Sequence, residues 1–211
     1  MCKRILAALT AAVLALSLSA CSQQEGSSSD VSQNSPASTA SQQPALPTED
    51  RAGNAITVPE TVNTIVSLAP SVTQVLCELG LADKIVGIDN QSPNYTDQLK
   101  DDLPQFDMMS VDTETLIALK PDIVFASGIS YVGAEDPFKS VRDVGICVAD
   151  IPSSSSLNDV KLDNQFIADC VGKSEEGKKL NDDMQATIDK VAAIGKTITD
   201  KQRVMFSIAD S

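Results

Sequence analysis

The sequence of 211 residues contains no histidine and no tryptophan, and aromatic residues make up only 3% of it. Without histidine, neither a Ser-His-Asp triad nor a Cys-His pair can form, and sites for bare zinc or manganese ions lose their usual ligands. No phosphate-binding glycine motif follows the first predicted strand, where Leu68-Ala69-Pro70-Ser71 stands instead. These absences favour a binding protein, with no catalytic residues and no metal ligands of its own.

Basic residues are also scarce, since 16 lysines and arginines face 29 aspartates and glutamates, for a net charge of −13. An acidic surface repels phosphate backbones and anionic lipid headgroups. We therefore expect no nucleic-acid partner. Any contact with a membrane has to come from something other than a basic face.

The first residues have the features of a bacterial export signal. Lys3 and Arg4 precede an apolar run over residues 5–18, which is too short to cross a bilayer comfortably, and Leu18-Ser19-Ala20-Cys21 follows. Small residues ending in cysteine are typical of a lipobox, so we predict a lipoprotein signal peptide over residues 1–21 and lipidation of Cys21. The alternative is an ordinary signal cut near Ala20. The expected location is extracytoplasmic, anchored by lipid to the bacterial cell membrane at the cell surface or in the periplasm.

Residues 22–54 are mostly Ser, Gln, Ala and Pro, with almost no large apolar side chains. Such a segment cannot bury enough surface to order itself, so it predicts a disordered tether. Beyond it lie Cys77, Cys147 and Cys170, each within an apolar stretch. Buried free thiols are the favoured interpretation, with one disulfide as the alternative.

From residue 55 onward, short β-branched runs alternate with helical patterns, which predicts an α/β fold with a parallel sheet. Core strands are expected over residues 65–69, 85–89, 122–126 and 146–149, with a weaker extended piece at 56–58. Shorter helices are expected over residues 70–80, 112–119, 137–144 and 156–171.

A different kind of element follows. Apolar residues in one stripe from Leu180 to Ile198 predict a helix over residues 174–198, about 25 residues and roughly 37 Å long at 1.5 Å per residue. Residues 203–209 then have a strand pattern close to the last residue, Ser211. A lone strand has no partner, so we expect the sequence to stop at the entrance to a second domain.

Two blocks carry a specific family resemblance. Residues 65–76, IVSLAPSVTQVL, with 79–89, LGLADKIVGID, and then residues 114–124 closely resemble the substrate-binding proteins of iron-siderophore, haem and cobalamin ABC importers. The resemblance implies a Rossmann-like lobe over residues 55–172 and a connector helix over 173–200. Residues 201–211 would be the first strand of a C-terminal lobe that is otherwise missing.

The resemblance also implies a function and a set of contact residues. The protein would be a monomer that captures a metal chelate, a ferric siderophore, haem or cobalamin, and delivers it to an ABC importer permease, with no cofactor of its own. A surface-anchored α/β enzyme with active residues beyond Ser211 is the alternative. Family positions at the strand ends assign ligand binding to seven residues, and a permease contact to Glu114. The seven are Pro70, Ser71, Gln91, Met108, Met109, Ser130 and Tyr131.

Overall fold

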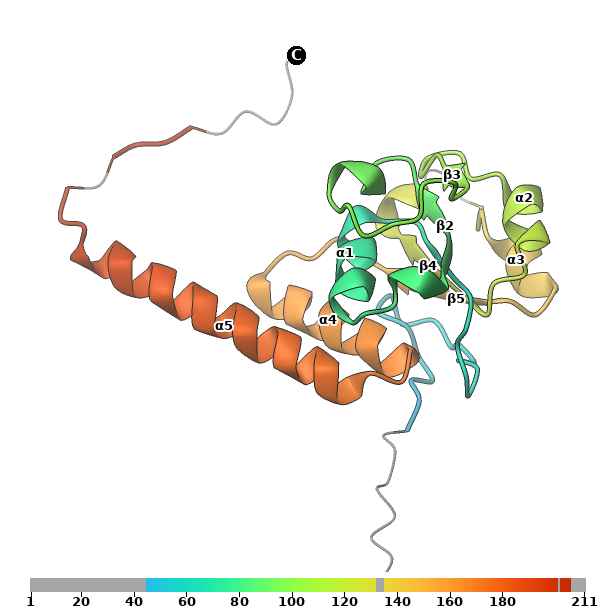
Figure 1. Ribbon diagram of the computed structural model, residues 1–211, viewed down its shortest axis with the longest axis horizontal. Coiled ribbons are helices and arrows are strands. Elements are labelled where there is room, and N and C mark those ends of the chain that lie inside the picture. Colours follow the sequence, from blue (N-terminus) through green and yellow to red (C-terminus); the bar gives the residue numbers. More distant parts are fainter. Residues whose placement is uncertain (1–44, 132–134, 201, 206–211) are drawn as a thin grey trace, which may run out of the picture. The chain divides into compact units, whose positions relative to one another are not determined.

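Short β-branched runs form the buried strands of a parallel sheet in the computed structural model, which describes residues 45–131, 135–200 and 202–205. The five strands lie in the order β3-β2-β1-β4-β5, and Figure 1 labels all of them except β1. The predicted α/β fold is confirmed; β3 is an unpredicted addition, and residues 56–58 form no strand. The strands are β1 (Ile65–Ser67), β2 (Ile85–Asp89), β3 (Gln105–Phe106), β4 (Ile123–Ser127) and β5 (Cys147–Ile151).

The helices begin where the sequence places capping residues. Asp112 and Ser156 accept hydrogen bonds from the first-turn N–H groups of α2 and α4, and Pro70 occupies the first position of α1. The α-helices are α1 (Pro70–Glu78), α2 (Thr113–Ala118), α3 (Lys139–Asp143), α4 (Leu157–Cys170) and α5 (Ser174–Thr197), with short 3-10 helices η1 (Ala82–Lys84), η2 (Ser92–Asn94) and η3 (Gly128–Ser130).

Helices cover both faces of the sheet. One core cluster joins α1 and α4 to the strands through side chains such as Leu76, Phe125 and Ile167. The other joins α2 and α3 to the opposite face through Leu116 and Val124, among others. Burial on both faces explains why the strand segments are apolar runs without strict alternation. The three cysteines of this region, Cys77, Cys147 and Cys170, are free and buried, as predicted.

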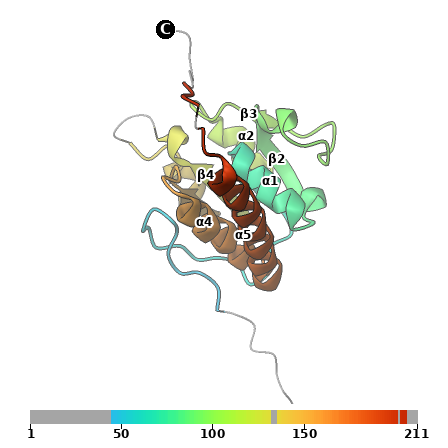
Figure 2. The same cartoon turned by 90° about the vertical axis from the view of Figure 1, so that its left-hand side faces the viewer.

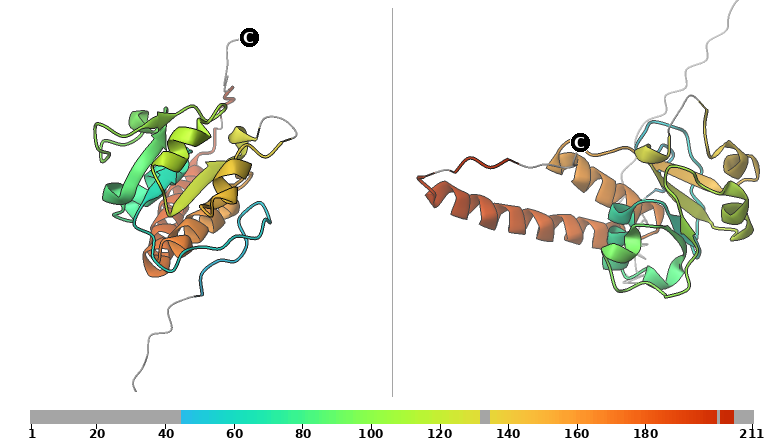
Figure 3. Two further views of the ribbon diagram at one scale, coloured as in Figure 1. Left: turned by 90° about the vertical axis from the view of Figure 1, so that its right-hand side faces the viewer. Right: turned by 90° about the horizontal axis from the view of Figure 1, so that it is seen from above.

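The long helix α5 packs alongside α4, as Figures 1 and 2 show. The side chain of Asn181 donates to the carbonyl of Lys161 at 2.8 Å and accepts from Asn164 at 3.1 Å. Residues 191–200 are all exposed, and α5 runs beyond the end of α4 (Figure 3). The predicted helix over residues 174–198 is thus confirmed.

Gly177 sets how closely α5 approaches α4. A Cβ atom at this position would lie 2.3 Å from the Cβ of Ala168, closer than side chains can come. We expect Gly177→Ala to destabilise the protein, because the overpacking costs about 1–3 kcal/mol, which outweighs the gain of about 1 kcal/mol in helix propensity. Urea unfolding measures the difference.

Gly195→Ala is the matched control, since the same helix has open space around Gly195. There the substitution should leave stability unchanged or raise it by about 0.5–1 kcal/mol. Equal effects of the two variants would contradict the close-approach explanation.

The packed part of the chain begins earlier than the composition indicated. Asp50 is 7% exposed and accepts hydrogen bonds from the backbone of Ala52 and Asn54, and Glu49 forms an antiparallel bridge with Ala55. We call residues 45–58 the N-terminal segment. Placing the end of the tether at residue 54 is therefore wrong, because one buried aspartate orders a stretch with few apolar side chains.

Several expectations fall on residues that the structure does not describe. The signal peptide, Cys21 and most of the tether lie outside it, as do residues 206–211 of the strand expected near the end. Residues 202–205 form neither helix nor strand. None of the helices in the described part of the chain has the length and apolar character needed to cross a membrane.

Candidate functional site

The sheet changes its winding direction between β1 and β4. The chain passes from β1 to β2 on one side, whereas β4 is followed by β5 on the other. In open parallel sheets, ligands bind at such a point, outside the carboxyl ends of the strands. This edge of the sheet is therefore the candidate site.

A chain of buried hydroxyl groups holds the loops after β1 and β2 together. Ser67, Thr73 and Ser92 are fully buried, and the contacts Thr73–Ser67 and Ser92–Thr73 are both 2.8 Å long. The chain ends on the carboxylate of Asp89, which accepts from the hydroxyl and, at 2.9 Å, from the N–H of Ser92. Because every polar group in it is paired, this network fixes the start of α1 and the turn at Gln91.

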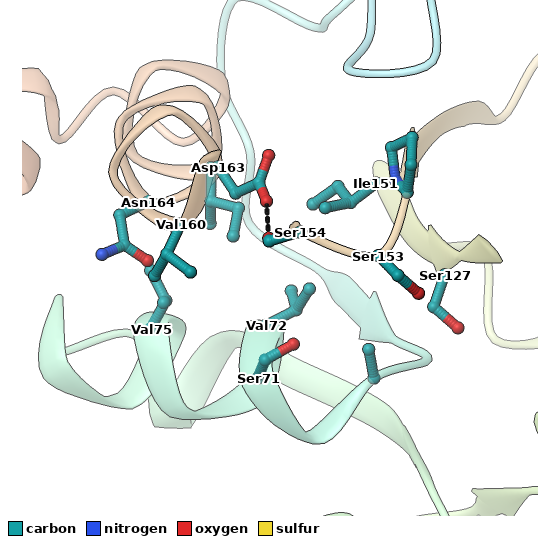
Figure 4. A pocket seen from close by; sticks show the side chains of 13 residues that line it. Ser71, Val72, Val75, Ser127, Ile151, Ser153, Ser154, Val160, Asp163 and Asn164 are labelled. Atoms are coloured by element: carbon teal, nitrogen blue, oxygen red, sulfur yellow. Dashed lines mark hydrogen bonds between the residues drawn. The ribbon is translucent and has the colours of Figure 1, made fainter. Parts of the chain in front are cut away.

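A cavity of about 160 Å³ opens at the ends of β1, β4 and β5, between α1 and α4 (Figure 4). Apolar side chains of both helices, including Val72 and Val160, line its inner part. Serine hydroxyls come from the strand ends, namely Ser71, Ser127, Ser153 and Ser154. The cavity thus combines apolar surface with several hydrogen-bonding groups, as small-molecule sites do.

One carboxylate lines the cavity, and its charge is compensated. Asp163 of α4 accepts a hydrogen bond from Ser154 Oγ at 2.6 Å, drawn in Figure 4, and one from Arg51 Nε at 2.6 Å. Its side chain is 11% exposed. The N-terminal segment therefore supplies the cation that balances the only acid lining this cavity.

Two hydroxyl groups near this edge lack a partner. The Oγ atoms of Ser127 and Ser130 are buried and make no hydrogen bond. An unpaired buried hydroxyl costs about 1–3 kcal/mol, so such groups are uncommon in folded proteins. Ser127 is one of the residues around the cavity, but its Oγ atom is shielded from solvent.

Tyr131 is turned inward. Its ring packs against Phe138 with centroids 5.7 Å apart, and its hydroxyl donates to Asp150 while accepting from Arg142 at 3.0 Å. Burial, together with the neighbouring carboxylate of Asp150, raises the pKa of Tyr131 well above its usual value. The phenol therefore stays protonated, and the side chain is held in a polar cluster.

The remaining predicted ligand residues lie at the same sheet edge. Pro70 and Ser71 follow β1, Gln91 follows β2, and the two methionines follow β3, with Met109 62% exposed. The parallel sheet thus brings all seven predicted residues to one edge, but only Ser71 lines the cavity.

Sequence reasoning missed the loop after β5. Residues 152–156, PSSSS, leave the sheet at the same edge as the loops that were selected. Applying the strand-end rule to the fourth predicted strand, residues 146–149, which became β5, would have found Ser153 and Ser154. Nothing in the local sequence points to Arg51, which lies 112 positions from its partner Asp163.

Glu114 lies apart from the cavity, in the first turn of α2, where it is exposed. Its backbone N–H donates to the capping carboxylate of Asp112 at 3.1 Å. The side chain is therefore presented to solvent at a rigid helix start. Among the described residues, no three His, Cys, Asp or Glu side chains cluster in a way that could hold a metal ion.

The fold and this edge define a lobe of a solute-binding protein of the parallel α/β kind. A family model described as periplasmic binding protein matches residues 65–211, and the chain belongs to that family. The names of similar proteins refer to the binding of a substrate, of iron or of haem.

An uncharacterized ABC transporter substrate-binding lipoprotein, YvrC of Bacillus subtilis (strain 168), is 29% identical over 159 residues. The match covers 75% of this chain and 50% of that protein, so the chain spans about half the length of this relative.

The similar solved structures include two binding proteins. A possible iron-binding (periplasmic solute-binding) protein from Staphylococcus epidermidis ATCC 12228 has a TM-score of 0.61 and 27% identity, over 68% of this chain and 55% of its own. The haem-binding protein HmuT has a TM-score of 0.62 and 25% identity, over 75% of this chain and 51% of its own.

Proposed function

We propose that this chain forms the ligand-binding lobe of an extracytoplasmic lipoprotein, anchored through Cys21, that captures a metal chelate and delivers it to an ABC importer permease. The ligand is an iron complex, either a ferric siderophore or haem, or it is cobalamin. The protein acts as a monomer and needs no cofactor. The observation that carries the proposal is the cavity at the winding switch of the sheet, on a lobe followed by the long helix α5.

The charges around the site favour cobalamin or another chelate with little net charge over an anionic siderophore. Arg51 is paired with Asp163, and Arg142 is paired with both Asp136 and Asp150. Neither guanidinium is left free to bind an anionic group on the ligand, although arginine is the usual partner for such groups. A chelate supplies the metal's own ligands, so the protein needs only shape, apolar surface and a few polar contacts.

The names of two similar structures support the choice of ligand class. One is described as possibly iron-binding and one as haem-binding, at 27% and 25% identity. The absence of histidine in the whole sequence also disfavours a bare transition-metal ion as ligand.

Calorimetric titration of the purified protein with haem, cobalamin and several ferric siderophores tests the proposal. We expect saturable binding of at least one of them, and much weaker binding of the corresponding metal-free chelators. Binding of none of these chelates, or turnover of simple esters or phosphates, would contradict the proposal.

A further inference from the structure

A second hollow of this lobe lies beside α1, away from the cavity. We call it the α1–α5 groove, because its walls come mainly from the later residues of α1, from residues 95–98 and from the first half of α5. Gln74 and Glu78 line the groove, whereas Val72 lines the cavity on a different face of the same helix. The groove is therefore a separate candidate site.

The size and the apolar wall of the groove suit a small organic molecule. Its volume is about 470 Å³, compared with about 160 Å³ for the cavity, and small-molecule sites typically measure about 300–1,000 Å³. Leu180 and Met184 contribute half-buried apolar side chains, and Cys77 is a buried part of the lining. The flexible thioether of Met184 adapts to different apolar surfaces. The groove thus offers room and apolar contact for an aromatic ring with its substituents.

Tyr95 gives the groove an exposed aromatic side chain. It is 59% exposed, and it is the one exposed aromatic residue in the part of the chain that the structure describes. Its backbone is held in place, since its N–H donates to the carbonyl of Ser92 at 3.0 Å and its carbonyl accepts from Gln74 Nε2 at 3.4 Å. The face of an aromatic ring attracts cations. Tyr95 therefore favours a positively charged group on a ligand that also contacts the apolar wall.

The charges of the groove have the same preference. Glu78 and Asp97 line it, are exposed, and form no ion pair within the described residues. Lysine and arginine are absent from its described lining. In the cavity, by contrast, Asp163 is balanced by Arg51. The negative charge in the groove is thus left for a ligand to compensate.

We propose that the α1–α5 groove binds a small amphipathic cation, an organic ammonium group carried on an aromatic or other apolar body. The ring of Tyr95 and the carboxylates of Glu78 and Asp97 meet the ammonium group, while Leu180 and Met184 contact the apolar body. This site is additional to the proposed site for a metal chelate and does not depend on it.

Probes of similar size and different charge test the site. Benzyltrimethylammonium, the neutral 2-methyl-1-phenylpropan-2-ol and the anionic 3-phenylpropionate are titrated into the purified protein at low ionic strength and followed by NMR. We expect the cation to bind about tenfold more tightly than the alcohol, since an exposed cation–π contact contributes a factor of about three and each exposed ion pair about two. The anion should bind more weakly than the alcohol. Equal binding of cation and alcohol, or shifts spread over other acidic surfaces instead of residues 74–78, 95–98 and 180–184, would overturn the proposal.

Two double variants test the role of the carboxylates. Glu78→Gln with Asp97→Asn should reduce the preference for the cation over the alcohol from about tenfold to about threefold. Glu60→Gln with Asp102→Asn is the matched control, because it removes the same charge from exposed positions outside the groove. The control should leave the preference unchanged. Equal losses in the two double variants would assign the preference to the net charge of the protein, and the groove would not be the site.

Tyr95 has its own pair of variants. Tyr95→Leu keeps an apolar side chain and removes the ring, so the preference for the cation should fall about threefold. Tyr95→Phe keeps a ring and should retain the preference. An unchanged preference in Tyr95→Leu would refute the contact between this ring and the ammonium group.

Competition distinguishes this site from the chelate site. Asn164 borders both the groove and the cavity, so the independence of the two sites needs its own test. A chelate that binds in calorimetric titration should keep its affinity when benzyltrimethylammonium is saturating. Competition between them would show that the groove is part of the chelate site, and the proposal of a separate site would be wrong. If the cation binds as expected and no chelate does, the proposed function fails while the groove site stands.

Discussion

Replacing Arg142 with methionine is expected to lower the free energy of unfolding by about 3 kcal/mol at neutral pH. Arg142 donates to Asp136 at 2.7 Å, to Asp150 at 2.8 Å and to the hydroxyl of Tyr131 at 3.0 Å. The Asp150 side chain is only 8% exposed, so the variant leaves a buried carboxylate without its cation. Breaking a buried pair from one side costs about 3–5 kcal/mol, and the 29% exposure of Arg142 favours the lower end.

The effect should depend on pH with a defined sign. Burial raises the pKa of Asp150 above the ordinary value of 3.8, and loss of Arg142 removes an opposing influence and raises it further. In the folded variant, the Asp150 carboxyl therefore stays protonated at pH values at which it is ionised in the unfolded chain. Protonation of Asp150 stabilises the folded variant fully at pH values below the pKa of this group in the unfolded chain. The stabilisation is lost as the pH rises through the pKa of Asp150 in the folded variant. The difference in free energy of unfolding between the unaltered protein and the variant should thus be largest at pH 7 and smaller at pH 4.

Urea unfolding of both proteins at the two pH values measures this. Lys139→Met is the control, because Lys139 on the same helix forms an exposed pair with Asp143, and its loss should cost less than about 1 kcal/mol. A deficit that is the same at pH 7 and pH 4 would show that Asp150 is not the group left unpaired.

Reversing the charge at Glu114 is expected to reduce ligand uptake at least about tenfold. If Glu114 meets a cationic side chain of the permease, an arginine there places like charges against each other, which costs several kcal/mol at an interface. Glu114 is exposed and lies outside the cavity, so neither ligand affinity nor fold stability should change by a comparable factor. Uptake into vesicles that contain the permease, measured with the unaltered protein and with Glu114→Arg, tests this.

Glu175→Arg is the matched control. Glu175 also lies in the first turn of a helix and is exposed, so both substitutions lose the same favourable interaction with the helix dipole. Uptake should fall only for Glu114→Arg. An equal fall in both variants would assign the effect to the helix start or to net charge, and the docking role of Glu114 would be wrong.

The sheet and helices could be predicted because each depends on local patterns. β-Branched runs such as 85–89 are buried on both faces, and Ser156 with Asp159 forms a local cap for α4. The strand β3 has only two residues, too few to show the alternation of side chains that marks a strand in a sequence. Its pairing with β2 depends on contacts across the sheet. Order in the N-terminal segment was missed for the same reason, since Asn54 reaches Asp150, 96 positions away.

The candidate site was predictable in its location and less so in its members. Strand ends indicated the correct edge, where Ser71 lines the cavity. Tyr131 shows the limit of that rule, because a position at a strand end does not decide whether the side chain faces solvent or, as here, Asp150. The orientation depends on Arg142 and Phe138, whose positions follow only from the folded chain.

The N-terminal segment also covers part of the outer strand β5. β5 is an outer strand of the sheet, and such strands can pair with strands of other molecules. The side chain of Asp50 accepts a hydrogen bond from the N–H of Asp150, and the N–H of Arg51 donates to the carbonyl of Asp150. Both backbone groups of Asp150 are therefore occupied. Asp50 and Arg51 thus protect the sheet against intermolecular strand pairing at this point.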